Sequence, residues 1–308
     1  MRVIHGTTEF ELEEKSAVSI GKFDGIHLGH QKLLHHILEQ KEQGMKAVVF
    51  TFDPPPSVFF GRTEEKELMT RAEKRFAFEK MGVDVLIEFP LTVQSASISP
   101  EEFITDILAK KLHAGYIAAG PDVSFGDKGA GNYVLLQALA RELGYEVQII
   151  DKVYFYGKEI SSTYVRKELA KGHMETVTEL LGAPYGISGT VTHGNRFGRT
   201  IGMPTANILP AASKLLPPNG VYYSEVLLRG EVHKGITNIG YKPTVSDERQ
   251  LGVETYIYDF HKDIYEEEIV VRLLAFQREE KKFEGKEALQ EQMARDIEDG
   301  RMFHLKKM

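Results

Sequence analysis

The sequence predicts an α/β domain with a parallel sheet, followed by an all-β domain that a helix closes. Strand-like and helix-like segments alternate through the first half, as they do in a parallel sheet with helices on both faces. The second half holds short β-rich segments with turn residues between them, which is typical of an antiparallel barrel or sandwich. The length of 308 residues suits about two domains. We therefore expect a first domain over residues 1–183 and a second over residues 184–308.

The strands predicted in the first half are short apolar runs, at residues 17–21, 46–52, 84–89, 116–120 and 146–150. Helices are predicted from apolar side chains at helical spacing and from cap residues, at 30–44, 70–81, from 99 onward and at 132–143. Thr70 and Glu73 have the spacing of a capping box at the start of one of these helices. Ser99 followed by Pro100 is also a typical helix start.

In the second half, strands are predicted at residues 185–191, 220–229, 231–238, 253–259 and 268–276. Residues 284–300 then have the apolar spacing of an amphipathic helix. The pattern changes near Pro184, which is why the domain boundary is placed there.

The composition is that of an ordinary globular protein, with 42% hydrophobic and 27% charged residues. The absence of cysteine rules out disulfides, thiolate metal sites and cysteine nucleophiles, and it fits a reducing cytoplasm. No apolar run of about 18 residues and no secretory signal is found, so we expect no membrane partner. A net charge of −7 with scattered basic residues argues against a nucleic-acid partner. We expect a cytoplasmic monomer that acts on small molecules.

Residues 21–30, GKFDGIHLGH, lie between a predicted strand and a predicted helix. Glycines in such a loop let the backbone approach an anion, and the free N–H groups of the helix's first turn point at it. His27 and His30 share one face at the helix start, where imidazoles can donate hydrogen bonds to phosphate and add positive charge as the transition state develops. Two other interpretations are a tight glycine turn with surface histidines and a zinc pair, although three-residue spacing alone is weak evidence for zinc.

Several motifs of the first half resemble one enzyme family. Residues 21–30 are similar to the His-x-Gly-His signature of nucleotidylyltransferases, in the form carried by prokaryotic bifunctional riboflavin kinase/FMN adenylyltransferase, or FAD synthetase. Residues 160–166, ISSTYVR, resemble that family's second signature. Residues 120–126, GPDVSFG, resemble its flavin-side loop.

The second half resembles the riboflavin kinase part of the same family. Residues 189–207 are similar to its glycine-rich signature. Segments 238–244, 253–255 and 278–283 and the final helix follow in the family's order. The resemblance covers nearly the whole chain, in two independent domains.

For the first domain, the resemblance implies a Rossmann-like nucleotidylyltransferase that transfers AMP from ATP to FMN, giving FAD and pyrophosphate. The nucleophile is already a phosphate oxygen, so catalysis should be mostly alignment and charge neutralisation. The implied catalytic residues are His27, His30 and Arg166. The implied ATP-binding residues are Gly21, Phe23, Asp24, Gly25, Gly29, Ser161, Ser162 and Thr163, of which the last three also suit a plain helix cap. The flavin candidates are Asp122 and Phe125, with Phe59 and Phe60 as weaker ones, although a phenylalanine at such a position is more often a core residue.

For the second domain, the resemblance implies phosphorylation of riboflavin by ATP. This reaction needs a base for the ribityl 5′-hydroxyl, a metal on the ATP phosphates and a loop that covers them. Glu254 stands where the family has its base, although a strand glutamate can also simply face solvent. Thr205 and Asn207 offer neutral oxygens that suit Mg²⁺ and phosphate. The implied ATP-binding residues of this domain are Gly194, Gly198, Arg199, Thr205, Asn207 and Asn238.

The sequence thus predicts an enzyme that converts riboflavin to FMN and FMN to FAD, with ATP and Mg²⁺ in both steps. Three departures from the family pattern motivate an alternative in which the adenylyltransferase is impaired: Pro55 replaces the usual histidine of a Pro-His-Pro stretch, Val123 replaces a phenylalanine, and Lys22 is a charged variant. A non-catalytic flavin-binding regulator and a nucleotidylyltransferase for another phosphate are further alternatives.

Overall fold

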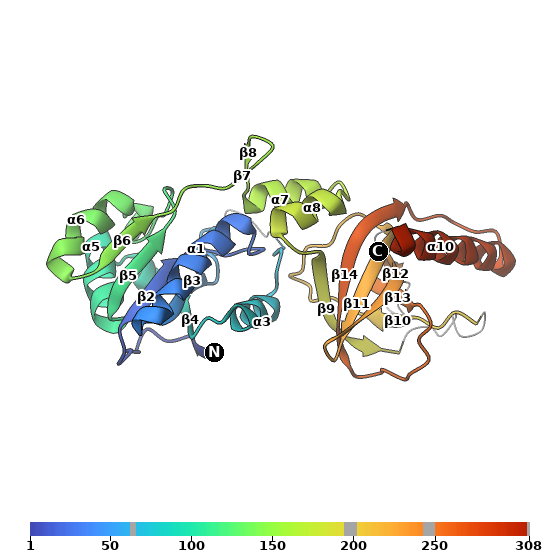
Figure 1. The fold of residues 1–308 in the computed structure, drawn as a ribbon, viewed down its shortest axis with the longest axis horizontal. Coiled ribbons are helices and arrows are strands. Elements are labelled where there is room, and N and C mark those ends of the chain that lie inside the picture. The colour runs from blue at the N-terminus through green and yellow to red at the C-terminus, as the bar shows by residue number, and fades with distance from the viewer. Residues whose placement is uncertain (62–65, 194–201, 243–249, 307–308) are drawn as a thin grey trace. The chain divides into compact units, whose positions relative to one another are not determined.

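The computed structural model describes residues 1–61, 66–193, 202–242 and 250–306 (Figure 1). They form two compact units, Met1–Ser162 and Thr163–Met308, and each unit is described here by itself. The division falls at the start of helix α7 (Ser162–Leu169), which precedes α8 (Met174–Leu181). The boundary expected near residue 184 stays a prediction.

The first unit is built on a six-stranded sheet whose paired strands are all parallel. The order across the sheet is β1 (Arg2–His5), β4 (Val85–Pro90), β3 (Lys46–Asp53), β2 (Ser16–Ile20), β5 (Ala114–Ala119) and β6 (Glu146–Ile149). The predicted α/β class is therefore confirmed. Strand β1 was not predicted, because it has four residues and only Ile4 among them is buried.

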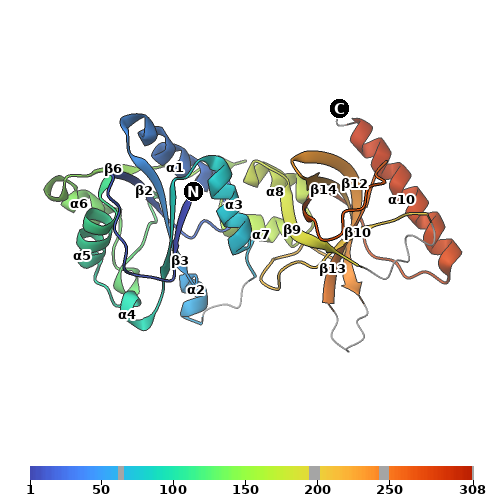
Figure 2. The same cartoon turned by 90° about the horizontal axis from the view of Figure 1, so that it is seen from below.

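Helices cover both faces of this sheet (Figure 2). On one face α1 (Leu28–Glu39) and α3 (Arg71–Met81) contribute Leu34 and Phe78 to a core that includes Ala17 of β2. On the other face α6 (Tyr133–Leu143) and the π-helix η2 (Phe103–Lys111) pack against Val18. Neighbouring residues of β2 thus enter opposite cores, as the two-residue period of a strand requires.

Shorter elements connect these layers: η1 (Gln40–Gln43), α2 (Pro56–Phe59), α4 (Val93–Ala96), α5 (Pro100–Glu102), η3 (Asp127–Gly129) and a hairpin of β7 (Tyr154–Phe155) with β8 (Lys158–Glu159). Both predicted helix starts are present. Thr70 and Glu73 form a capping box before α3, and Ser99 with Glu102 forms another before α5.

The second unit contains a closed barrel, so the barrel rather than the sandwich is confirmed. Its strands follow the order β10 (Ala206–Ile208), β13 (Gln250–Ile257), β12 (Glu231–Lys242), β11 (Gly220–Leu228), β14 (Glu268–Arg278) and β9 (Tyr185–Thr192). All of the pairings are antiparallel. Strand β10 was not predicted, since three residues carry no readable alternation.

Helix α10 (Lys286–Lys306) packs on the barrel and runs past the predicted end at Gly300. Gly300 stays helical because it is a contact point rather than a cap. A Cβ there would lie 2.0 Å from the hydroxyl of Tyr258. Further along the helix, the ring of Phe303 stacks on Tyr223 with centroids 4.2 Å apart. The helix is thereby fixed on the barrel at its C-terminal half.

Candidate active sites

The loop between β2 and α1 is wound by three residues with positive φ angles. Phe23 has φ 48°, Gly25 has φ 85° and Ile26 has φ 44°. Such angles favour glycine, so the backbone is strained at Phe23 and Ile26. Strained backbone is common at functional sites. Asp24 holds the loop in shape, because its Oδ1 accepts a hydrogen bond from the N–H of Leu68 at 2.9 Å. Asp24 therefore has a structural partner besides its predicted ligand.

The side chain of Phe23 anchors this loop in the core of the unit. Its ring is fully buried, 5.6 Å from the ring of Phe78 and 5.2 Å from that of His30. Gly21 lies close beside it, since a Cβ at that position would be 3.1 Å from the Phe23 ring, which is tighter than an ordinary contact. The side chain of Phe23 thus belongs to the core, and only its backbone is left to meet a nucleotide.

His27 and His30 meet at the N-terminus of α1. His27 is the N-cap residue, and its Nδ1 accepts a hydrogen bond from the backbone N–H of His30 at 3.4 Å. The two rings are stacked, with centroids 3.7 Å apart and planes 20° apart. Gly29 permits this packing, because a Cβ there would lie 3.1 Å from the His27 ring.

Burial keeps the histidine pair neutral. Desolvation lowers the pKa of His27 from 6.5 to about 4, against smaller raising effects of Asp24 and Glu159. Burial also lowers the pKa of His30 well below 6.5, and the neighbouring His27 adds to this lowering. Near pH 7 both imidazoles are therefore uncharged hydrogen-bonding groups. The positive charge that the pair is expected to add as the transition state develops stays a prediction.

His30 also carries a sign of a ligand position. Its buried Nδ1 has no hydrogen-bond partner among the described residues, and such groups normally find one. The zinc interpretation gains no support, because within the described ranges no three or more His, Cys, Asp or Glu side chains are grouped so as to hold a metal.

The histidine pair lies where the chain order of the sheet reverses. From β2, strands β3 and β4 lie toward one edge of the sheet, and β5 and β6 lie toward the other. In open α/β sheets, ligands bind at the carboxyl ends of the strands at such a reversal. The loops that follow β2 and β5 are therefore the expected places for a nucleotide.

The loop after β5 separates its two predicted flavin residues. The side chain of Asp122 is 72% exposed and forms an ion pair with Lys152 at 3.3 Å. Phe125 is only 2% exposed, and its ring stacks on Phe103 with centroids 5.2 Å apart. As placed, the Phe125 ring has no open face, so the structure favours the alternative of a core phenylalanine. Phe60, at the end of α2, is instead 51% exposed.

The segment that precedes α7 is tied to the histidine loop. The hydroxyl of Ser162 donates to the carbonyl of Asp24 at 2.8 Å. The carbonyl of Ile160 lies 3.7 Å from the position of a Cβ on Gly29. Ser162, and with it the adjacent Ser161, thus lies next to the loop, and the contacts of both with ATP stay predictions. Thr163 and Arg166 belong to the other compact unit, so their part in this site stays a prediction.

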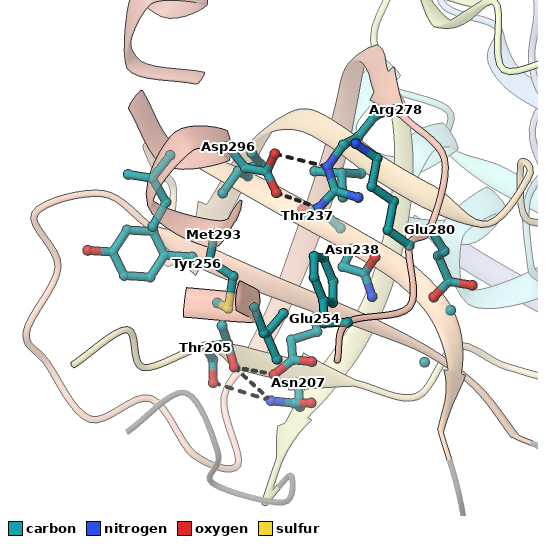
Figure 3. Close-up of a pocket in the computed structure, with 18 of the residues that line it drawn as sticks. Thr205, Asn207, Thr237, Asn238, Glu254, Tyr256, Arg278, Glu280, Met293 and Asp296 are labelled. Carbon is teal, nitrogen blue, oxygen red and sulfur yellow. Dashed lines mark hydrogen bonds and ion pairs between the residues drawn. The ribbon is translucent and has the colours of Figure 1, made fainter. Parts of the chain in front are cut away.

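In the second unit, a pocket of about 420 Å³ lies between the barrel and α10 (Figure 3). Four predicted residues line it: Thr205, Asn207, Asn238 and Glu254. Strand register explains their meeting, because Glu254 of β13 pairs with Asn207 of β10 on one side and with Asn238 of β12 on the other.

Hydrogen bonds join three of these residues. The hydroxyl of Thr205 donates to Oε1 of Glu254 at 2.5 Å. The amide nitrogen of Asn207 lies 3.3 Å from both the carbonyl and the hydroxyl oxygen of Thr205. Glu254 therefore faces a polar pocket with partners rather than open solvent. Gly194, Gly198 and Arg199, also expected to bind ATP here, lie outside the described residues.

The opposite wall of the pocket combines apolar residues with a buried ion pair that sequence reasoning did not single out. Arg278 at the end of β14 donates from Nε and Nη2 to the two carboxylate oxygens of Asp296 on α10, at 2.9 and 2.5 Å (Figure 3). Gln292 also donates to Asp296 at 2.9 Å. The apolar lining is formed by Val221, Ile236, Phe283, Leu289, Met293 and Ile297. The only signal in the sequence was the match of segment 278–283 and the final helix to the family's order.

The fold and the two sites define a class of transferase in which an α/β nucleotide-binding unit precedes a β-barrel unit. The model of the FAD synthetase family matches residues 9–164, and that of the riboflavin kinase family matches residues 181–304. The chain belongs to the bifunctional riboflavin kinase/FMN adenylyltransferase family. It has riboflavin kinase and FMN adenylyltransferase activities, which together make FAD. The resemblance that the motifs indicated is confirmed.

Relatives support this along the whole chain. The bifunctional riboflavin kinase/FMN adenylyltransferase of Listeria monocytogenes is 39% identical over 303 residues, which are 97% of this chain and 96% of the relative. That of Bacillus subtilis is 36% identical over 310 residues, covering 97% of each chain.

A solved structure also matches in full length. The crystal structure of a macrolide-efflux protein from Streptococcus pneumoniae superposes with a TM-score of 0.84 at 30% identity, covering 97% of this chain and 98% of that one. None of the helices in the described part of this chain is long and apolar enough to span a membrane.

Proposed function

We propose that the pocket between the barrel and α10 is where riboflavin is phosphorylated, and that the His27 loop is where FMN is adenylylated. The observation that carries the first assignment is the group of Thr205, Asn207 and Glu254, which lines a pocket with an apolar wall. A flavin ring needs such a wall, and its ribityl hydroxyl needs a nearby base.

In the kinase step, the 5′-hydroxyl oxygen of riboflavin attacks the γ-phosphorus of ATP. The bond from that phosphorus to the β,γ-bridging oxygen breaks, and ADP leaves. Glu254 accepts the proton of the hydroxyl as the new P–O bond forms. The 2.5 Å hydrogen bond from Thr205 fixes one carboxylate oxygen of Glu254 and leaves the other for the substrate.

The donor set beside Glu254 fits Mg²⁺, which the family implies. Thr205 and Asn207 bring a hydroxyl and an amide oxygen, and both are hard oxygen ligands. A cation that already carries ATP phosphates and water needs only a few such ligands from the protein. When bound, Mg²⁺ supplies positive charge to the phosphoryl oxygens. Thr205 and Asn207 are the residues we propose to hold it.

In the adenylyl transfer, a phosphate oxygen of FMN attacks the α-phosphorus of ATP. The bond from the α-phosphorus to the α,β-bridging oxygen breaks, and pyrophosphate leaves without a proton transfer. His27, His30 and the N–H groups of the loop would hold the phosphates by hydrogen bonds. Because the histidine pair is neutral, its contribution is alignment, to which Arg166 would add charge.

The test separates the two sites on one purified protein. Riboflavin with ATP and Mg²⁺, and FMN with ATP and Mg²⁺, are incubated in parallel, and the flavins are separated by chromatography. His27→Ala should lower FAD formation and leave FMN formation intact, whereas Glu254→Gln should lower FMN formation by roughly 10²–10⁴-fold and spare FAD formation from FMN. Equal loss of both activities in either variant would contradict the assignment of the two sites.

The same assay addresses the impaired-domain alternative. If the wild-type protein makes FMN but turns FMN into FAD only slowly, Pro55→His and Val123→Phe are the reversions to test first. The monomeric state, the cytoplasmic location and the domain boundary at residue 184 stay predictions.

A further inference from the structure

Lys152 occupies a junction that neither motif includes. It follows β6, and its ammonium group lies 3.3 Å from Oδ2 of Asp122, in the loop after β5. The same ammonium lies 2.9 Å from Oε1 and 3.0 Å from Oε2 of Glu159. One cation therefore bridges the predicted flavin-side loop and the residue just before the 160–163 segment.

Glu159 links this cation to the histidine pair. Its carboxylate is close enough to His27 to oppose the lowering of that residue's pKa. The hairpin that ends at Glu159 closes on itself through the N–H of Ile160, which donates to the carbonyl of Val153 at 2.8 Å. The position of the 160–163 segment therefore depends on how the base of this hairpin is held.

Two further hydrogen bonds hold the same segment against the histidine loop. Lys32 of α1 donates to the carbonyl of Asp151 at 3.1 Å, and the hydroxyl of Ser162 donates to the carbonyl of Asp24. Asp151 lies in the connection between β6 and α7, and Ser162 is the first residue of α7. Lys152 lies in the same connection and also contacts Asp122 in the loop after β5.

Besides holding the two segments together, Lys152 changes the electrostatic potential at the proposed site. Asp122 and Glu159 place two carboxylates beside a site that must receive ATP and the phosphate of FMN. Uncompensated, these carboxylates would repel both substrates, with a strength that depends on salt. Lys152 is 30% exposed and shares its charge between the two carboxylates, so it offsets that repulsion at close range.

We propose that Lys152 is a positioning residue for FMN adenylylation, which holds the loop after β5 and the 160–163 segment in register and neutralises the carboxylates of Asp122 and Glu159. The inference rests on the proposed assignment of adenylyl transfer to the His27 site. Exposed ion pairs contribute little to stability. The effect is therefore expected in substrate binding and not in the melting temperature.

The experiment measures KM and kcat for FAD formation from FMN in the full-length protein, at low and high salt. Lys152→Met should raise the KM for ATP about tenfold at low salt, equivalent to about 1.4 kcal/mol, with kcat changed less than about threefold. The rise should shrink at high salt, since screening weakens the repulsion. Lys152→Arg should keep the wild-type KM, because it keeps the charge at the same place.

A matched control and a rescue sharpen the test. Lys128 is 89% exposed and lies 3.9 Å from its nearest carboxylate, Asp127, so Lys128→Met removes the same charge without a bridge and should leave the KM unchanged. Adding Glu159→Gln to Lys152→Met removes one uncompensated carboxylate and should recover part of the KM.

An unchanged KM for ATP in Lys152→Met would overturn the proposal. A rise in that KM that is the same at low and high salt, and that Glu159→Gln does not reverse, would also overturn it. An unchanged melting temperature of each variant reports that the first unit, which holds Lys152, is folded. If His27→Ala leaves FAD formation intact, the proposed site itself has failed, which is a different result from a silent Lys152.

Discussion

The ion pair of Arg278 with Asp296 should be the main anchor of the N-terminal half of α10, and Asp296→Asn tests this. The substitution keeps the side-chain shape and removes the charge. The two side chains are 17% and 7% exposed and form two hydrogen bonds. Removing one partner of a buried pair costs about 3–5 kcal/mol. Arg278 also donates to the carbonyl of Glu279, so we expect the lower end, about 3 kcal/mol.

The assay is amide hydrogen exchange of the full-length protein, read by mass spectrometry on peptides of α10. Local opening of a helix sets its exchange rate, so a loss of about 3 kcal/mol should speed exchange about 100-fold. Peptides from β11 and β12 should keep their protection. Because α10 forms one wall of the pocket, the KM of the kinase for riboflavin should rise in the same variant.

The control is Glu298→Gln on the same helix, because Glu298 is exposed. It removes one negative charge and should leave exchange unchanged. Unaltered protection of α10 in Asp296→Asn would refute the reasoning. A double variant, Arg278→Met with Asp296→Leu, should regain much of the stability, since no unpaired charge stays buried.

Three further predictions concern the cores and the histidine pair. The pKa of His27 is lower in the folded protein than the unfolded value of 6.5, so stability should fall as pH drops from 6.5 toward 4. His30 adds to this fall, so in urea unfolding the loss at pH 5 should be about 2 kcal/mol larger in the wild type than in His27→Gln, and an equal loss in the two proteins would contradict this. Thr237→Val should cost about 1–3 kcal/mol of unfolding free energy, because its buried hydroxyl bonds those of Ser224 at 2.7 Å and Thr255 at 2.8 Å; a neutral result would mean that the network contributes nothing. Phe125→Leu should lower the thermal stability of the protein and leave the KM for FMN unchanged, whereas a large rise in that KM would restore Phe125 as a flavin contact.

Most of the fold could be predicted because its signals are local. The predicted strands of the sheet are continuous apolar runs, which parallel strands need when both faces are buried. Two helix starts could be predicted because a capping box joins residues only three apart, as at Thr70 with Glu73 and at Ser99. Strands β1 and β10 were not predicted, because they are held by pairing with distant strands and have no hydrophobic pattern of their own.

The candidate sites divide in the same way. His27 and His30 are three residues apart on one helix start, so their contact is local and could be predicted. Glu254 and Asn207 meet through strand register, which the sequence alone does not give, and only the family resemblance brought them together in advance. The charge state of the histidines could not be predicted, because it depends on how deeply the loop is buried.

The contact of Lys152 with Asp122 could not be predicted from the sequence either, because the two residues are far apart along the chain. Asp122 and Lys152 are adjacent only because β5 and β6 are neighbouring parallel strands whose carboxyl ends lie at the same edge of the sheet. The pairing of Arg278 with Asp296 likewise depends on the rotation of α10 about its axis, which packing on the barrel decides.

Under the proposed assignments, the two sites of this chain of net charge −7 would both contact phosphate through neutral groups. His27 and His30 are neutral, and Thr205 and Asn207 offer only dipoles. Dipoles fixed by the fold align phosphate oxygens without the desolvation cost of a buried cation. Under the proposed assignments, the compensating charge would come from Arg166, from the Mg²⁺ proposed to accompany ATP, and from cations at the margin such as Lys152. It follows that substrate affinity at the His27 site should depend on salt through these marginal cations, while the alignment supplied by the histidine pair should not.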